Sequence, residues 1–167
     1  MSSGELNLES SHPDVLKALV ASGWYPGRTA DIVGTLSRLT KVGYRATPLA
    51  MELLTNVLDL RIDPLNEQGV NFVNSEPLLI DPIGVGSRHV DEAQRIGAVL
   101  GEELFPVGWW LSYSHVYLGS SGALVAYASG LVWRLGDTPR DGIEFAVRAH
   151  RRLECLYAEE GVTPWPK

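Results

Sequence analysis

The sequence predicts an α+β fold, in which a mainly antiparallel sheet has helices packed on one face. Two observations lead to this prediction. Apolar residues recur at helical spacing over residues 13–58, whereas residues 104–135 contain short segments rich in β-branched and aromatic side chains. Helices that come first, strands that follow and one closing helix are typical of α+β domains rather than of alternating β-α-β units.

The length and composition predict one folded domain. The chain has 167 residues, of which 45% are hydrophobic and 20% charged, as in ordinary globular proteins. We assign residues 13–157 to a single domain, residues 1–12 to a flexible N-terminus and residues 158–167 to a C-terminal tail that frays. The N-terminal residues lack the pattern of a signal peptide, and no apolar run approaches the roughly 20 residues that span a bilayer. We therefore expect a cytoplasmic protein.

The first two helices are predicted from their apolar stripes and from the glycines that end them. Apolar residues three and four apart mark a helix over Pro13–Ser22, which Gly23 ends. The second helix is expected to begin near Thr29 and to stop at Gly43, because a residue without a Cβ readily adopts the left-handed conformation that ends helices.

Three later helices follow the same rules. Thr47 is the expected N-cap of the third, because its hydroxyl can accept a hydrogen bond from the first turn, and Pro48 fits that turn. A fourth helix is predicted over Arg88–Glu103. The last begins after Thr138, the N-cap of a capping box, and is expected to continue through Cys155.

Five strands are predicted where β-branched and aromatic residues lie between turn signals. Ser129 and Gly130 separate the last two strands and suit a tight hairpin turn. The predicted strands are Gly69–Asn74, Pro77–Ile80, Pro106–Tyr113, Ser121–Ala128 and Leu131–Leu135.

The stretch GWYPGR after the first helix is predicted to be a structural corner. Pro26 and Gly27 suit a type II turn with positive φ at the glycine, and Trp24 and Tyr25 offer large areas to bury between helices. Arg28 would face the positive end of the next helix dipole. We therefore expect Arg28 to pair with a carboxylate or with carbonyl groups elsewhere in the domain.

The negative charge of the chain lies in its middle third. The formal net charge is −6, and residues 52–103 hold three Lys or Arg against ten Asp or Glu. Such a local field attracts a basic partner and repels nucleic acid and anionic lipid, so neither nucleic acid nor a membrane is an expected partner. The alternative is a solvated acidic surface that only aids solubility.

A series of motifs resembles the third subgroup of the SUKH superfamily of immunity proteins. LKALVASGWYPGR, LDL, LLIDPIGV, GEELFPVG, SGLVWRLG and LGDTP occur in the family's order between Val15 and Ala149. The resemblance implies a SUKH-like α+β domain of a bacterial polymorphic toxin system, which binds a cognate secreted toxin inside the producing cell and blocks it. Toxins of such systems are commonly nucleases or nucleic-acid deaminases. The structural positions within these motifs are Gly23, Trp24, Pro26, Gly27, Arg28, Pro106, Gly108, Gly130 and Gly136.

Two features depart from the family's pattern. Tyr127 stands where the family often has an acidic residue before the hairpin glycine, and Leu131 stands where a basic residue often follows it. Gly142 interrupts the last predicted helix. The resemblance therefore defines the fold more closely than it defines the toxin, and no toxin-contacting residue is transferred from the family.

No pattern in the sequence predicts catalysis. Ser112, Ser114 and His115 lie close together, but neighbours on a strand point to opposite faces, and GSSG lacks the spacing of a nucleophile elbow. This stretch is interpreted as a hairpin connection, and the adjacent acidic pairs of the fourth helix as solvated positions. The single Cys155 is interpreted as inert, and neither a metal site nor a cofactor is expected.

We therefore predict a non-catalytic immunity protein that meets a basic toxin surface with its acidic middle segment. The alternatives are an intracellular scaffold or regulatory peptide-binding module on the same fold, and a small hydrolase. Trp109 and Trp110 should face opposite ways on a strand. We choose Trp110 as the residue that anchors the partner. The alternative is that a two-layer fold buries both tryptophans. The oligomeric state is not predicted. The expected charge contacts are Asp59, Asp63, Glu67, Glu76 and Asp81.

Overall fold

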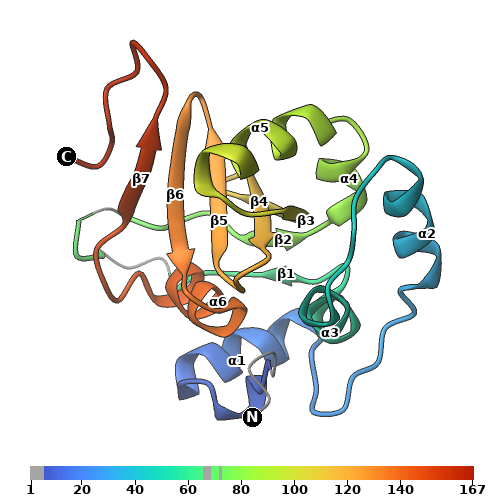
Figure 1. The fold of residues 1–167 in the computed structure, drawn as a ribbon. Helices are drawn as coiled ribbons and strands as arrows, with labels where there is room; N and C mark the ends of the chain where they lie inside the picture. Colours follow the sequence, from blue (N-terminus) through green and yellow to red (C-terminus); the bar gives the residue numbers. More distant parts are fainter. Residues whose placement is uncertain (1–5, 66–68, 72) are drawn as a thin grey trace.

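The computed structural model describes residues 6–65, 69–71 and 73–167 (Figure 1). Six α-helices and a short 3-10 helix surround one sheet in this part of the chain. The helices are η1 (Leu8–Ser10), α1 (Pro13–Ser22), α2 (Val33–Lys41), α3 (Pro48–Val57), α4 (Pro82–Gly86), α5 (Val90–Leu100) and α6 (Pro139–Arg148). The strands are β1 (Arg61–Ile62), β2 (Leu78–Ile80), β3 (Leu104–Trp110), β4 (Ser114–Gly119), β5 (Leu124–Ala128), β6 (Leu131–Gly136) and β7 (Glu154–Ala158).

The sheet is antiparallel, and each strand pairs with the next one along the chain. The α+β class and the antiparallel sheet are therefore confirmed. Strand β4 occupies the stretch that was interpreted as a hairpin connection. It forms a hairpin with β3 on one side and another with β5 on the other, and hydrogen bonds to both strands stabilise it.

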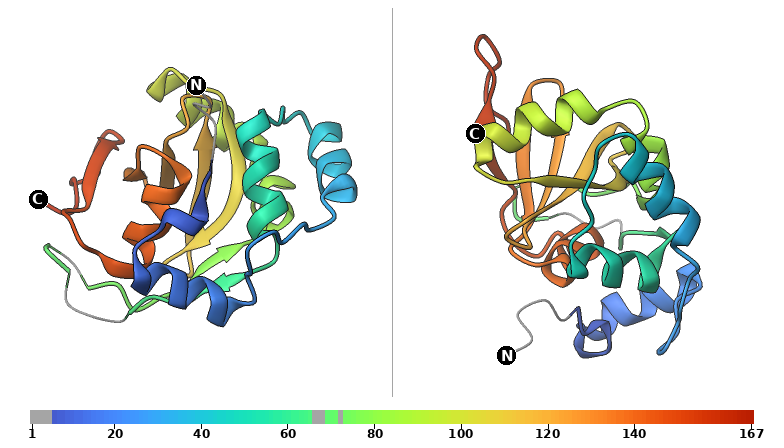
Figure 2. Two further views of the ribbon diagram at one scale, coloured as in Figure 1. Left: turned by 90° about the horizontal axis from the view of Figure 1, so that it is seen from below. Right: turned by 45° about the vertical axis from the view of Figure 1, so that its right-hand side comes forward.

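Helices cover both faces of the sheet, whereas the sequence analysis expected one (Figure 2). Helix α5 lies over one face, and α3 and α6 lie over the other. Neighbouring residues of β4 point to opposite sides, yet Val116 and Tyr117 are both 0% exposed. Both faces are thus apolar and both need cover, which explains the second layer of helices.

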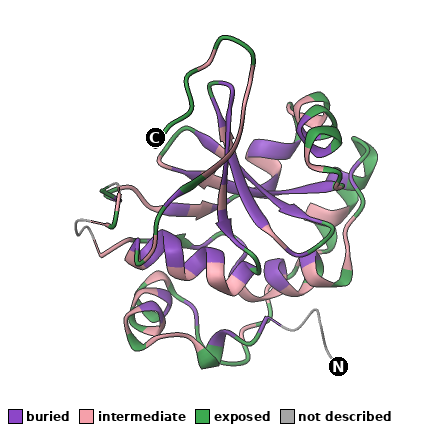
Figure 3. Ribbon diagram, turned by 60° about the vertical axis from the view of Figure 1, so that its left-hand side comes forward, coloured by how far each residue is buried: buried purple, intermediate pink, exposed green. Residues whose placement is uncertain are grey.

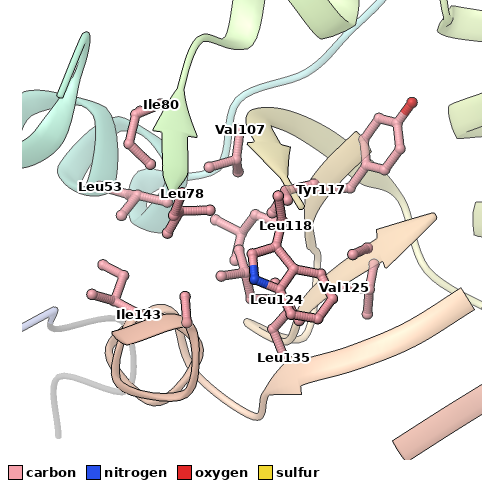
Figure 4. Close-up of a cluster of buried hydrophobic side chains, with 14 of the residues drawn as sticks. Leu53, Leu78, Ile80, Val107, Tyr117, Leu118, Leu124, Val125, Leu135 and Ile143 are labelled. Carbon is pink, nitrogen blue, oxygen red and sulfur yellow. The ribbon is translucent and has the colours of Figure 1, made fainter. Parts of the chain in front are cut away.

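The core between the sheet, α3 and α6 is shown in Figure 4, where Leu53, Leu78 and Ile143 converge from separate elements. Tyr117 turns its hydroxyl away from this cluster. Figure 3 shows that buried residues follow the strands and the inner sides of the helices, while the loops are largely exposed. No helix in the described part of the chain combines the length and the apolar character needed to cross a membrane.

Three predicted helix boundaries and one predicted strand differ from the structure. Helix α2 begins at Val33 rather than near Thr29, because the backbone N–H of Ala30 donates to the Thr55 carbonyl of α3 at 2.8 Å and holds the segment outside the helix. Helix α5 is shorter at both ends than the predicted Arg88–Glu103. The described residues of 69–74 form no strand beyond an isolated bridge, and the Asn71 side chain hydrogen-bonds Leu153 instead.

The last helix also ends earlier than predicted. Ala149 follows Arg148 with φ of 47°, a left-handed conformation that ends α6, and Cys155 lies on β7 rather than on a helix. The tail does not simply fray: the Trp133 indole N–H donates to the Trp165 carbonyl at 2.6 Å, and the two rings are 6.0 Å apart.

The N-terminal segment that the sequence analysis treated as flexible packs on the domain where the structure describes it. Leu6 and Leu8 are only 2% and 1% exposed. The backbone N–H of Leu6 also donates to the Glu52 carboxylate of α3 at 2.9 Å. Residues 6–12 are therefore part of the fold.

The GWYPGR corner joins α1 to the segment before α2. Gly23 has φ of 109° and ends α1, and Gly27 has φ of 83° in a turn closed by the Arg28 N–H and the Tyr25 carbonyl at 3.0 Å. Trp24 is 2% exposed, as a corner between packed elements requires. Tyr25 is 57% exposed, so the expectation that it is buried is wrong.

Arg28 connects this corner to the end of α3. Its Nη1 donates to the Asn56 carbonyl at 2.8 Å and its Nη2 to the Leu58 carbonyl at 2.9 Å. Both carbonyls lie in the last turn and C-cap of α3, where backbone oxygens lack helical partners and the dipole is negative. Because α2 begins only at Val33, the arginine faces no helix N-terminus.

Three of the glycines named in the motifs allow close contacts or tight turns. A Cβ on Gly108 would lie 1.7 Å from the Leu79 carbonyl oxygen of the neighbouring strand. A Cβ on Gly136 would lie 2.3 Å from the backbone nitrogen of Gly142 in α6, and a Cβ on Gly142 would lie 2.5 Å from Cδ2 of Leu124. Gly130, with φ of 82°, closes the β5–β6 hairpin, and Pro106 marks a register shift before Gly108 in β3.

Arg28→Ala is expected to lower the free energy of unfolding by about 2 kcal/mol, because two hydrogen bonds from a charged donor to helix-end carbonyls are lost. Chemical denaturation of the purified protein measures this change. The control Arg38→Ala removes an exposed arginine of α2 and should change the free energy by less than about 0.5 kcal/mol. An Arg28→Ala protein as stable as the wild type would contradict the capping role.

Gly108→Ala is expected to cost about 2 kcal/mol or more, because β2 must move away from β3 to admit the methyl group. Gly34→Ala is the matched control, since a Cβ there meets nothing within 4 Å and alanine is the better helix former. Thermal unfolding followed by circular dichroism should show a lower midpoint for the first variant and an equal or higher midpoint for the second. Equal midpoints for both variants would exclude a tight β2–β3 contact.

Candidate partner-binding surface

The two tryptophans of β3 have opposite environments. Trp110 is 0% exposed, and its ring centroid lies 6.1 Å from that of Trp133 and 6.2 Å from that of Phe145 in the core under α6. The indole of Trp110 is therefore inaccessible to a partner. This burial corrects the prediction that Trp110 anchors the toxin. Trp109 is only partly buried and faces the other side of the sheet.

Asp81 fixes the orientation of Trp109. The aspartate is the N-cap of α4, where one carboxylate oxygen accepts the Gly84 N–H at 3.0 Å, and the other accepts the indole N–H of Trp109 at 3.3 Å. The register of β2 and β3 brings them together, since Leu79 pairs with Trp109 and the Asp81 N–H donates to the Val107 carbonyl at 3.0 Å. Asp81 nevertheless stays exposed.

A group of hydrogen-bonded side chains from β4 and α5 packs against Trp109. The His115 ring lies 5.0 Å from Trp109 in an edge-on contact and 4.1 Å from the His89 ring. His115 Nδ1 donates to Glu92 Oε2 at 2.5 Å, and the Tyr117 hydroxyl donates to the same oxygen at 2.5 Å. The carboxylate of Glu92 thus joins α5 to β4.

These contacts shift the ionisation of the group. Burial raises the pKa of Glu92, but the hydrogen bonds from His115 and Tyr117 outweigh it, so the pKa of this carboxyl lies below its ordinary value. Burial, and then the hydrogen bond to Glu92, raise the pKa of Tyr117 far above its ordinary range. Glu92 is therefore an anion and Tyr117 a neutral donor at neutral pH.

The acidic residues named from the sequence divide into two groups along β2. Asp59 is exposed, and its N–H donates to the Ile80 carbonyl at 3.1 Å, next to Asp81. At the other end of the strand, Asp63 pairs with Arg61 at 3.1 Å and Glu76 accepts a hydrogen bond from Ser112 at 2.6 Å. Glu67 lies outside the described residues. The structure therefore brings Asp59 and Asp81 together and separates Asp63 and Glu76 from them.

We name the first group, with its supporting residues, the acidic-aromatic surface. It consists of Asp59, Asp81, Glu92, Trp109 and His115. Carboxylates beside a partly exposed indole suit the recognition of a cationic side chain, by charge and by contact with the ring face. No cluster of three or more His, Cys, Asp or Glu side chains suited to hold a metal ion occurs among the described residues.

Sequence reasoning missed Glu92 and His115 as members of this surface. Glu92 was interpreted as a solvated helix position and His115 as part of a connection. A signal was present, because His115 and Tyr117 are two residues apart and therefore share one face if the segment is a strand. That spacing is informative only once the segment is known to form strand β4.

Glu92→Gln is expected to lower stability more at neutral pH than at acid pH. A carboxyl whose folded pKa is depressed stabilises the fold above its ordinary pKa of 4.5, and this contribution disappears as the pH falls through the lower folded pKa. Denaturation curves of both proteins over a pH series should converge below about pH 4.5. A difference that stays constant or grows with falling pH would contradict the hydrogen-bonded anion.

A match to a known protein family covers most of this chain. The family model described as SUKH-3 immunity protein matches residues 11–147, which includes the motifs from GWYPGR to LGDTP. No curated protein and no solved structure matches the chain. Because the family match covers most of its length, this protein belongs to the SUKH-3 immunity protein family.

Proposed function

We propose that this protein binds and neutralises a cognate secreted toxin inside the producing bacterium, as a binding protein without catalysis of its own. Membership of an immunity protein family supports the role. The observation that carries the choice of surface is the pairing of exposed Asp81 with the indole of Trp109, held in place by β2, β3 and α4.

The charge of this surface favours a basic toxin. Enzymes that act on nucleic acids use Lys and Arg to bind phosphates, so a nuclease or a nucleic-acid deaminase would present the complementary positive patch. Exposed carboxylates at Asp59 and Asp81 would speed the encounter with such a patch. An arginine or lysine over Trp109 would add about 0.5–2 kcal/mol. Occupying the nucleic-acid site of the toxin would block it without any bond chemistry.

Binding to a candidate toxin domain, chosen from the genes that adjoin this one, tests the proposal. Co-expression should rescue growth, and the purified pair should form a complex whose affinity falls as salt is raised. Asp81→Asn is expected to weaken the complex by about tenfold or more, because the charge is lost while asparagine still caps α4. Trp109→Ala should weaken it by a similar factor.

Asp63→Asn is the matched control, since this exposed aspartate lies at the far end of β2 and should leave the affinity unchanged. Growth that is not rescued, with no complex in solution, would end the immunity proposal. A complex that tolerates both Asp81→Asn and Trp109→Ala would keep the role but remove this surface from it.

A further inference from the structure

A cleft of about 300 Å³ lies between α5, the loop that joins α2 to α3, and the start of β3. Its walls are apolar where Val90, Ala93 and Leu104 line it. Helix α5 supplies one wall and also carries Glu92 of the acidic-aromatic surface, so the two features share an element. The cleft volume lies at the lower limit of small-ligand pockets, which suits one long side chain.

A buried aromatic residue lines this cleft. Tyr44 lines it and is 5% exposed, yet its hydroxyl has no hydrogen-bond partner among the described residues. Burial, and then the charge of Glu92, raise the pKa of Tyr44 to about 12, so the group stays a neutral hydroxyl. Because this oxygen is closed to solvent, Tyr44 adds no polar atom that a ligand in the cleft could reach.

The charged residues around the cleft are mainly acidic. Glu102 and Glu103 line it, against Arg45 as the basic residue of the lining. Arg45 is paired with Glu103 at 3.2 Å, and both side chains are largely exposed, at 83% and 68%. The Glu102 carboxylate accepts the Ser121 N–H at 2.8 Å, which holds it in place. The lining therefore carries two carboxylates against one guanidinium.

We propose that this cleft receives a lysine or arginine side chain of the bound toxin, an inference that rests on the proposed function. The aliphatic stem lies along the apolar wall of Val90, Ala93 and Leu104, as long basic side chains commonly do. The charged head lies at the mouth of the cleft, where the carboxylates of Glu102 and Glu103 attract it. The toxin is thus held at two neighbouring places, the cleft and the acidic-aromatic surface.

The protein alone provides the first test, with butylguanidinium as the probe and uncharged butylurea as its matched control. Nuclear magnetic resonance titration should show shifts at residues 43–45, 90–94 and 102–104 with butylguanidinium and much smaller ones with butylurea. Glu102→Gln should reduce the probe affinity several-fold, because it removes a carboxylate that attracts the guanidinium, whereas Tyr44→Phe should leave the affinity unchanged, because that hydroxyl is closed to solvent. Equal shifts with both probes, or none in the cleft, would overturn the proposal.

The complex with the toxin domain provides the second test. Ala98→Trp fills the mouth of the cleft from an exposed position on α5, whereas Val99→Trp adds the same bulk to a neighbouring residue outside the lining. We expect affinity to fall about tenfold or more in the first variant and to stay unchanged in the second.

The outcomes separate the two proposals. Weakening by Asp81→Asn without weakening by Ala98→Trp would overturn the cleft inference and leave the immunity role standing. Probe binding without an effect of Ala98→Trp on the toxin would also overturn it, and would identify the cleft as a site for a small cation. If the wild-type protein does not bind the toxin at all, the proposed function is wrong. The probe titration still tests the cleft in that case.

Discussion

The close approach of β2 to β3 at Gly108 determines where the acidic-aromatic surface lies. The Leu79 carbonyl occupies the space that any side chain at position 108 would need. With this contact in place, Asp81 leaves β2 directly beside Trp109 and starts α4, so one carboxylate both caps a helix and holds an indole. The position of the acidic residues on this surface follows from that single backbone contact.

The layer of helices over this face gives the surface its rigidity. Glu92 of α5 accepts two short hydrogen bonds from β4, and bonds to an ionised group are stronger than neutral ones. The opposite face is closed by Trp110 and Trp133 under α6. A surface held from both sides loses little freedom on binding, and such preorganisation favours affinity without further contacts.

Local sequence signals predicted the elements that local chemistry determines. Thr47 and Thr138 accept hydrogen bonds from backbone N–H groups of the helices they precede, as threonine N-caps do. The antiparallel sheet and the family also followed from the sequence. The need for a partner at Arg28 followed from its charge alone, although the helix-end carbonyls that meet it belong to α3, about thirty residues away.

What could not be predicted depends on contacts between distant segments. The alternation of side chains along a strand predicts that Trp109 and Trp110 face opposite ways. Which of them is buried depends on Trp133 and Phe145, which pack against Trp110. Strand β4 forms because it pairs on both sides, and Cys155 joins β7 because the left-handed Ala149 ends α6 early. Glu92 could not be identified for the same reason: its hydrogen bonds are to β4, and the sequence of α5 alone does not distinguish it from a solvated helix position.

Hydrogen exchange of the protein, alone and in complex with the proposed cognate toxin, locates the binding surface most directly. Contact through the acidic-aromatic surface predicts slower exchange over residues 81–92, which form α4 and the first turn of α5. Slower exchange confined to α1 and α6, on the opposite face of the sheet, would contradict it.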